Sequence, residues 1–334
     1  MSDTSTAVEK PATGKIKNKK KVYTGPKKSF KTYIKRYWQL YLLLLLPIAY
    51  LLIFKYLPMR YVLLAFKEYK LNMPLMKMPW ANVKGTTDIF KYFKTAFGNP
   101  DFRRALINTV KLNLLDLVCG FPAPILFALI LNELPFKGFK KAVQTIAYMP
   151  HFLSWVIIAS LCTQLFAPTD GMINSLLSKM GLSTIPFLDD PSHWVITYVL
   201  TGVWQSFGWG SIIYLAAIAG INTELYEAAS VDGANRFQKM WHITLPGIKP
   251  TIVVLLVMNL GYIMGGGFER PFAMKNNLVI NVAEVISTFV YKVGIQQLKI
   301  SLTTAVGLFQ SVVGLFFLLG ANTISRKLGE RGIW

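Results

Sequence analysis

The sequence predicts an all-α membrane protein with six transmembrane helices, and three observations lead to this fold class. The chain has 334 residues, 53% of them hydrophobic, with a mean hydropathy of +0.41, and soluble domains of this size are usually more polar. Several apolar stretches reach the roughly 20 residues that a helix needs to cross a bilayer. A strongly basic segment precedes the first of these stretches, as on the cytoplasmic side of many membrane proteins.

The basic segment, residues 1–37, is expected to be a disordered cytoplasmic tail. It holds eleven Lys and Arg residues and almost no large apolar residue before Phe30. This tail accounts for much of the formal net charge of +20, so the charge indicates retention inside the cell and contact with anionic lipid, and not nucleic-acid binding. The apolar stretch that follows begins too late and is too long for a secretory signal peptide.

The six spans are predicted at residues 38–57, 105–131, 142–166, 194–220, 251–272 and 302–324. With the tail inside, residues 132–141, 221–250 and 325–334 are cytoplasmic, and both termini lie inside. Residues 58–104 then lie outside although they carry nine Lys and Arg residues, because long loops follow the charge rule weakly. Together, residues 38–334 form the predicted membrane domain.

One outer segment, residues 171–181, has apolar side chains at helical spacing. This pattern predicts a short amphipathic helix that lies against the membrane interface or the helix bundle. A role in docking a partner and a role as a simple connection both fit the pattern.

Common catalytic and metal-binding motifs are absent from the sequence. It contains no G-x-x-x-x-G-K-[ST], H-E-x-x-H, C-x-x-C or G-x-S-x-G pattern. The two cysteines lie in apolar stretches and are interpreted as small buried side chains, and the three histidines are scattered along the chain. We therefore predict no catalytic residue, no metal site and no ATP hydrolysis by this chain.

Polar and aromatic residues inside the spans suggest a path for a substrate. Charged groups are costly in lipid, so they should face a bundle interior or a water-filled cavity. Aromatic rings beside amide and charged groups suit sugars, because sugar rings stack on aromatic faces and hydroxyls need donors and acceptors. A buried pair or an interhelical hydrogen bond remains an alternative for Asp116, and an outer-interface anchor remains one for residues 259–272. The candidate path residues are Asp116, Trp204, Trp209, Asn259, Tyr262, Phe268, Glu269 and Arg270.

Residues 221–250 are too polar to span a membrane, and they predict a compact pair of short helices. Residues 225–234 suit a first helix, in which Ala228 and Ala229 allow a partner to approach closely. Gly233 permits a sharp turn with positive φ, and we expect a second short helix to end at Pro246. Such a unit fits a groove on another protein, although a signalling dock or a plain connection is also consistent with the pattern.

The stretch "EAASVDGANRFQKMWHITLP" resembles the coupling-loop motif of bacterial binding-protein-dependent ABC importers, in which E-A-A is followed by D-G-A and I-x-L-P. The resemblance extends over roughly residues 41–334. Residues 267–295 and the end "ISRKLGERGIW" are similar to the permeases of the polysaccharide and lipoprotein-type oligosaccharide subgroup. The matching motif residues are Glu227, Ala228, Ala229, Asp232, Gly233, Ala234, Ile243, Leu245 and Pro246.

This resemblance implies a type I, maltose-permease-like importer subunit in a bacterial plasma membrane, which moves oligosaccharides by alternating access. It implies four kinds of partner: a second permease subunit that makes a heterodimer, two cytoplasmic ATPase subunits, an extracellular lipid-anchored sugar-binding protein, and the oligosaccharide. ATP and Mg²⁺ would be held by the ATPases, with no cofactor in this chain. The ATPase-coupling residues would be Glu227, Ala228, Ala229, Asp232, Gly233, Ala234, Leu245 and Pro246, with Glu227 pairing a basic group.

Two other classes of function stay open at this point. A membrane-bound glycan-processing enzyme would need a catalytic group near an interface, and Asp116, Glu269 and Arg270 are its only candidates. A docking sensor would use the same cytoplasmic segment without any coupling to an ATPase.

Overall fold

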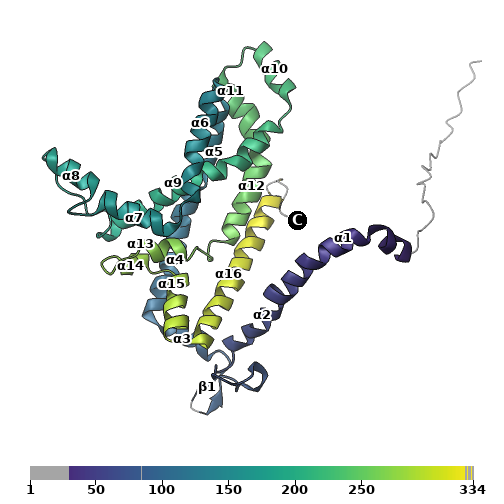
Figure 1. Cartoon of the computed structure of the whole chain (residues 1–334), viewed down its shortest axis with the longest axis vertical. Coiled ribbons are helices and arrows are strands. Elements are labelled where there is room, and N and C mark those ends of the chain that lie inside the picture. The colour runs from purple at the N-terminus through teal and green to yellow at the C-terminus, as the bar shows by residue number, and fades with distance from the viewer. Residues whose placement is uncertain (1–29, 84, 328, 330–331, 333–334) are drawn as a thin grey trace, which may run out of the picture. The chain divides into compact units, whose positions relative to one another are not determined.

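The computed structural model describes residues 30–83, 85–327, 329 and 332 (Figure 1). Most of the predicted tail, residues 1–29, lies outside the described residues. The chain divides into two compact units, Met1–Arg60 and Tyr61–Trp334, which are considered separately.

The first unit contains α1 (Phe30–Leu51), the π-helical turn η1 (Leu52–Tyr56) and α2 (Leu57–Met59). The first predicted span lies inside Tyr33–Ala65, a helical stretch long and apolar enough to cross a membrane. Helix starts at Phe30, so the last residues of the predicted tail are helical, with a kink at Tyr37. The rings of Tyr33 and Tyr37, one helical turn apart, lie 5.8 Å from each other.

The second unit is built from long helices joined by short ones. The long helices are α4 (Pro100–Gly120), α5 (Pro122–Asn132), α6 (Lys137–Tyr148), α7 (Trp155–Phe166), α9 (Pro191–Ala219), α12 (Leu245–Gly261) and α16 (Ile300–Lys327). The shorter ones are η2 (Arg60–Ala65), η3 (Leu75–Lys77), α3 (Lys91–Gly98), η4 (Met149–Phe152), α8 (Met172–Lys179), α10 (Thr223–Val231), α11 (Arg236–Lys239), η5 (Met240–Thr244), α13 (Glu269–Met274), α14 (Ile280–Ala283), α15 (Ile286–Val290) and η6 (Tyr291–Gln296). Two two-residue strands, β1 (Asn82–Val83) and β2 (Thr86–Thr87), pair antiparallel.

Local signals in the sequence start the long helices. The Asn99 side chain caps α4 by accepting from the backbone N–H of Asp101 at 2.8 Å, and Pro100 occupies the first turn. Asp190 caps α9 in the same way, also with a proline next to it. Only Phe121, whose φ and ψ remain helical, separates α4 from α5, so Pro100–Asn132 counts as one candidate span.

The all-helical membrane fold is confirmed, whereas the count of six spans stays a prediction. Among the described residues, four helical stretches are long and apolar enough to cross a membrane, and a bent pair makes a fifth. The fourth predicted span corresponds to α9, whose 29 residues suffice in length but include many Trp, Tyr, Gly and Ser residues. These residues lower its hydropathy below that of the other spans.

Two predicted spans differ in shape from a straight helix. The third bends by 102° between η4 and α7, because Pro150 interrupts the backbone ladder and Ser154 caps a new helix. The fifth ends at Gly261 instead of residue 272, because the glycines at 265–267 favour a turn, and Gly266 has a φ of +46°.

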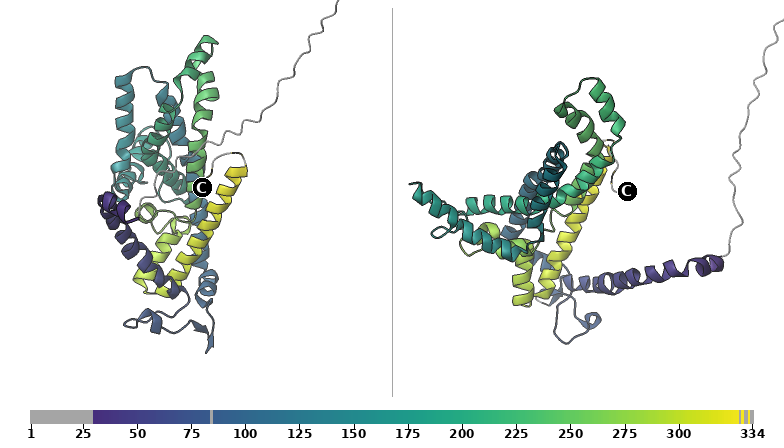
Figure 2. Two further views of the ribbon diagram at one scale, coloured as in Figure 1. Left: turned by 90° about the vertical axis from the view of Figure 1, so that its right-hand side faces the viewer. Right: turned by 45° about the horizontal axis from the view of Figure 1, so that its top comes forward.

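Three apolar clusters form the core of the second unit. One surrounds the fully buried Trp194 between α4, α7 and α9, and one surrounds Phe102 and Phe289 between α4, α15 and α16. A third surrounds Ile248, where α5, α9 and α12 meet. α12 and α16 run side by side, and α10 and α11 lie at the end of the unit opposite to α3 and β1 (Figures 1 and 2).

The predicted amphipathic helix at residues 171–181 is confirmed as α8. Its buried residue is polar: Asn174 is fully buried and makes three hydrogen bonds to the backbone of Ala167 and Ile185. The apolar side chains of Met172 and Leu176 are exposed in the isolated chain.

Candidate functional site

The segment that joins α9 to α12, residues 221–250, folds back on itself through two short helices. The Asn222 side chain caps α10, and Gly233 follows with a φ of +80°, which glycine adopts without strain. Asn235 then starts α11 in a capping box with Gln238. The predicted first helix and glycine turn are therefore present.

The predicted stop at Pro246 is wrong, because the helix continues through this proline. Residues 236–261 form one helical stretch of 26 residues, with the π-helical turn η5 near its N-terminal end. Pro246 stands in the first turn of α12, just after the wider turns of η5, where its missing N–H costs little.

α10 is fixed against the start of this long helix by polar contacts. The Tyr226 hydroxyl lies 2.9 Å from Thr244 Oγ1, and Lys239 Nζ donates to Ser230 Oγ at 2.6 Å. Between them lies a hollow of about 330 Å³, lined by Ala229, Asp232, Gly233, Ala234, Gln238, Lys239, His242 and Ile243.

Most of the motif side chains on this segment are accessible. Glu227, Ala228, Asp232, Gly233 and Pro246 are exposed, whereas Ala229, Ala234 and Leu245 are partly buried. Large apolar side chains on the same segment also face outward: Val231, Phe237 and Trp241 are 87%, 76% and 64% exposed. An exposed apolar surface on a small-residue hairpin is typical of a docking element.

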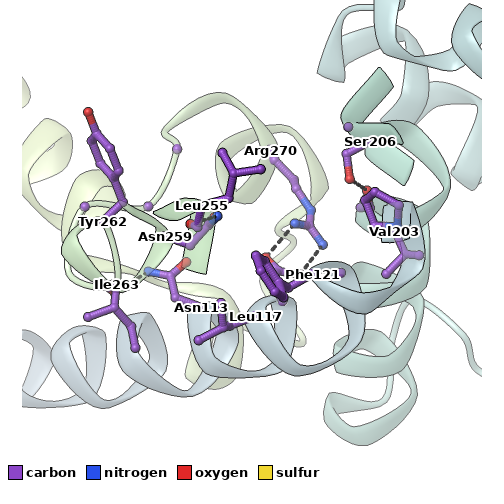
Figure 3. Close-up of a pocket in the computed structure, with 18 of the residues that line it drawn as sticks. Asn113, Leu117, Phe121, Val203, Ser206, Leu255, Asn259, Tyr262, Ile263 and Arg270 are labelled. Atoms are coloured by element: carbon purple, nitrogen blue, oxygen red, sulfur yellow. Dashed lines mark hydrogen bonds and ion pairs between the residues drawn. The ribbon is translucent and has the colours of Figure 1, made fainter. Parts of the chain in front are cut away.

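A cavity of about 750 Å³ lies within the helix bundle (Figure 3). Its walls come from α4, α5, α9, α12, the turn after α12 and the start of α13. The lining is mainly small and apolar, with a few polar groups, as in many ligand sites. The lining residues are Asn113, Asp116, Leu117, Gly120, Phe121, Pro124, Gly202, Val203, Ser206, Gly210, Ile213, Tyr214, Leu255, Asn259, Tyr262, Ile263, Gly265, Gly266, Gly267 and Arg270.

An ion pair stands at the edge of this cavity. Arg270 Nη1 and Nη2 donate to the two Asp116 carboxylate oxygens at 2.7 and 3.2 Å, and Nη2 also donates to the Tyr198 carbonyl. The guanidinium packs over the rings of Tyr198 and Trp155. Gly202 leaves room for it, because a Cβ there would overlap the guanidinium. Figure 3 shows Arg270 reaching across toward α4. Asp116 therefore belongs both to a buried pair and to the cavity wall.

The candidate path residues divide into two groups. Asp116, Asn259, Tyr262 and Arg270 line the cavity, and the others do not. Trp209 stacks on His151, Trp204 lines a separate apolar hollow between α7 and α9, Phe268 stacks on Phe272, and Glu269 is exposed at the start of α13.

Sequence reasoning missed several cavity residues, among them Asn113, Ser206, Gly202 and Gly210. The two glycines lie eight residues apart on α9, and this spacing places them on one helix face. The sequence did contain a signal for these positions: small residues recur along one face of a helix that is otherwise rich in aromatic residues.

One polar stripe on α4 holds the segment between residues 263 and 287. Asn113 donates to the Ile263 carbonyl at 2.7 Å, and Thr109 Oγ1 accepts from the Ile286 N–H at 2.9 Å. Asn108 donates to the carbonyls of Asn281 and Glu284 at 2.9 and 3.0 Å. Beside this stripe lies a second, small space of about 10 Å³, which is room for a single water and shares Asn113 and the glycines at 265–267 with the wall of the cavity.

Comparison with known proteins places the chain among transport proteins. Residues 120–329 match the family described as "Binding-protein-dependent transport system inner membrane component". Protein LplB of Bacillus subtilis (strain 168) is 45% identical over 301 residues, which cover 90% of this chain and 92% of that protein. The polygalacturonan/rhamnogalacturonan transport system permease protein YteP of the same organism is 42% identical over 295 residues, which cover 88% and 90%.

A solved structure supports the same family. A chain of a bacterial ABC transporter involved in the import of the acidic polysaccharide alginate superposes with a TM-score of 0.80 and 43% identity, covering 89% of this chain and 98% of that one. The matched family covers more than half of the chain and includes residues 221–250 and the cavity helices α5, α9 and α12, whereas α4 lies almost entirely before the match. The chain therefore belongs to the family of inner membrane components of binding-protein-dependent transport systems.

Proposed function

We propose that this chain is a permease subunit of an ATP-driven importer that carries acidic oligosaccharides across the plasma membrane of a bacterium. A binding protein outside the cell would deliver the sugar, and the cavity described above would hold it during transfer. No covalent chemistry is needed, because the substrate crosses unchanged.

The observation that carries this proposal is the single helical stretch of residues 236–261. It begins within the cytoplasmic segment beside Gly233 and ends at the cavity, where Leu255 and Asn259 form part of the wall. At 1.5 Å per residue, its 26 residues extend over roughly 39 Å. A displacement of α10 would therefore be transmitted to the cavity wall by one continuous helical stretch.

The partner that displaces α10 would be a cytoplasmic ATPase that carries ATP and Mg²⁺. The exposed side chains of Glu227 and Asp232 and the apolar surface near Val231 offer it both a charge and a hydrophobic contact. A complete importer would pair this chain with a second permease and use two such ATPases. The tail would remain on the same side as the ATPases.

The class of substrate follows from the relatives and is compatible with the cavity. The two named relatives with stated substrates handle polygalacturonan or rhamnogalacturonan and alginate, which are acidic polysaccharides. The cavity offers amide groups and the Tyr262 ring for sugar hydroxyls and faces. Among the described lining residues, Arg270 is the one cation, and it is already paired with Asp116. An acidic sugar would therefore meet little net charge in the cavity and would not be held too tightly to leave it.

The polar stripe on α4 would act as the outer seal of the cavity. Asn108, Thr109 and Asn113 hold the irregular segment that lines the small space of about 10 Å³ next to the cavity. Opening of the cavity to the outside would have to break these hydrogen bonds. Movement of the helical stretch of residues 236–261 toward the turn at Gly266 would be a direct way to break them.

The experiment compares two glycine variants in the importer reconstituted in lipid vesicles. Gly233 and Gly181 both have positive φ, +80° and +74°, and a Cβ at either would meet no atom within 4 Å. Valine at each site thus imposes similar backbone strain, of roughly 1–2 kcal/mol. We expect Gly233→Val to abolish sugar-stimulated ATP hydrolysis and uptake, whereas Gly181→Val keeps both. Equal activity of the two variants would rule out coupling through this segment.

A further inference from the structure

A second recess lies far from the intramembrane cavity, at the end of the molecule that carries α3. It has a volume of about 340 Å³ and is built from α3, the turn before α16 and the first turn of α16. We call it the outer recess. It is lined by Tyr69, Lys91, Tyr92, Thr95, Asn99, Leu298, Lys299, Ile300, Ser301 and Leu302.

Contacts between distant parts of the chain form this recess. The Tyr69 N–H donates to Ser301 Oγ at 2.9 Å, and the Ser301 hydroxyl donates to the Lys67 carbonyl at 2.7 Å. Leu298, in the turn before α16, adopts a φ of +57°, which is unusual for a branched side chain. The recess is thus a fixed feature of the fold, and its volume falls within the range of about 300–1,000 Å³ found for ligand pockets.

The lining has the chemistry of a site for a charged sugar. The rings of Tyr69 and Tyr92 offer faces for a pyranose, and Thr95, Asn99 and Ser301 supply hydroxyl and amide groups. None of these residues lines the intramembrane cavity.

Two cations complete the recess. Lys91 Nζ donates to Glu68 Oε1 at 2.9 Å, which uses one of its three N–H donors and fixes the ammonium 5.6 Å from the centre of the Tyr92 ring. Lys299 is exposed at the opposite wall. The surrounding segment, residues 58–104, has nine Lys and Arg residues against three Asp and Glu residues, so it attracts anions.

We propose that the outer recess is an outer subsite that binds one uronate unit of an acidic oligosaccharide before the sugar enters the intramembrane cavity. The carboxylate would pair with Lys91 and Lys299, and the sugar face would stack on Tyr92. This inference rests on the proposed function for the substrate class and for the outer location of residues 58–104. The concave shape of the outer recess favours a sugar over a protein partner, because a protein would need a broad surface of roughly 800 Å².

The test uses the complete importer in lipid nanodiscs without its binding protein. The probe is a galacturonate pentasaccharide, and a neutral arabinose pentasaccharide of the same length serves as the comparison; binding is measured by titration calorimetry. Lys91→Gln removes a recess cation. Lys94→Gln is the matched control, because Lys94 lies on the same helix and also pairs with a carboxylate, that of Asp88 at 2.9 Å, but does not line the recess.

We expect Lys91→Gln to weaken pentagalacturonate binding about tenfold, which is the loss of one charge-assisted hydrogen bond, and Lys94→Gln to change it less than twofold. Binding of the neutral sugar should respond to neither variant but should weaken in Tyr92→Leu. Equal effects of the two lysine variants, or no binding by the unmodified importer at millimolar sugar, would overturn the subsite.

Two further outcomes separate this proposal from the proposed function. If Lys91→Gln leaves sugar binding unchanged and weakens binding of the delivery protein, the recess docks a protein and the subsite is overturned. If the importer takes up only neutral sugars, with every variant alike, the substrate class in the proposed function fails. A result that overturns only the subsite would leave the proposed coupling through Gly233 untouched, because the Gly233→Val experiment measures ATP hydrolysis and uptake and not sugar binding at the outer recess.

Discussion

Replacement of Asp116 by Asn isolates the energetic role of the ion pair at the cavity wall. The Arg270 side chain is 12% exposed and that of Asp116 is 30% exposed, so the pair is largely removed from water. Loss of one member of a buried pair leaves the other charge uncompensated, which typically costs about 3–5 kcal/mol. Arg270 would keep the Tyr198 carbonyl and two aromatic rings, so we expect a cost near the lower limit, about 3 kcal/mol.

The measurement is the thermal unfolding midpoint of the purified importer in nanodiscs. Asp101→Asn is the matched control, because Asp101 pairs with Arg104 at the same distance of 2.7 Å but with side chains 48% and 37% exposed. A pair this exposed contributes about 1 kcal/mol or less. The midpoint should therefore fall clearly for Asp116→Asn and little for Asp101→Asn.

The double variant Asp116→Asn with Arg270→Gln supplies the decisive comparison. It removes the uncompensated charge, so it should be more stable than Asp116→Asn alone, although each change by itself destabilises. Stability losses that simply add in the double variant would refute the interpretation of a coupled buried pair.

Two other changes test neighbouring features. Gly202→Ala should displace the Arg270 guanidinium and lower the thermal midpoint, whereas Gly307→Ala, which meets open space on α16, should not. The Lys91 hydrogen bond lowers the pKa of Glu68 below its usual 4.5, so this pair stabilises the fold at neutral pH and loses its effect as pH falls below that value. The difference in thermal midpoint between the unmodified protein and Glu68→Gln should accordingly shrink under acidic conditions and remain constant above about pH 6.

Features fixed by short-range chemistry were predictable from the sequence. The turn at Gly233 needs a residue that tolerates positive φ, and the helix at α8 follows from apolar side chains at regular spacing. The bend of the third span was not predictable in the same way. Its apolar stretch is continuous, and hydropathy does not register that Ser154 caps a new helix after Pro150.

The cavity was only partly predictable, because its walls join residues far apart in the chain. Asp116 and Arg270 are 154 positions apart, so neither position indicates the other. Aromatic residues on α9 point to several sides, since this helix packs against α4, α5, α6 and α12. Trp204 and Trp209 therefore face other neighbours, and composition alone could not distinguish them from cavity residues.

Several polar side chains within the predicted spans form hydrogen bonds with irregular backbone in the second unit. The segment after α12 leaves the helical ladder, and unpaired N–H and C=O groups at membrane depth are costly. Asn113 of α4 and Gln310 of α16 donate to the consecutive carbonyls of Ile263 and Met264 in this turn, each at 2.7 Å. A seal of this kind can be released and remade, because it consists of a few hydrogen bonds and not of a packed apolar interface. The same side chains that make the broken helix tolerable in a membrane would therefore let the proposed outer seal open, with water replacing their hydrogen bonds to the backbone.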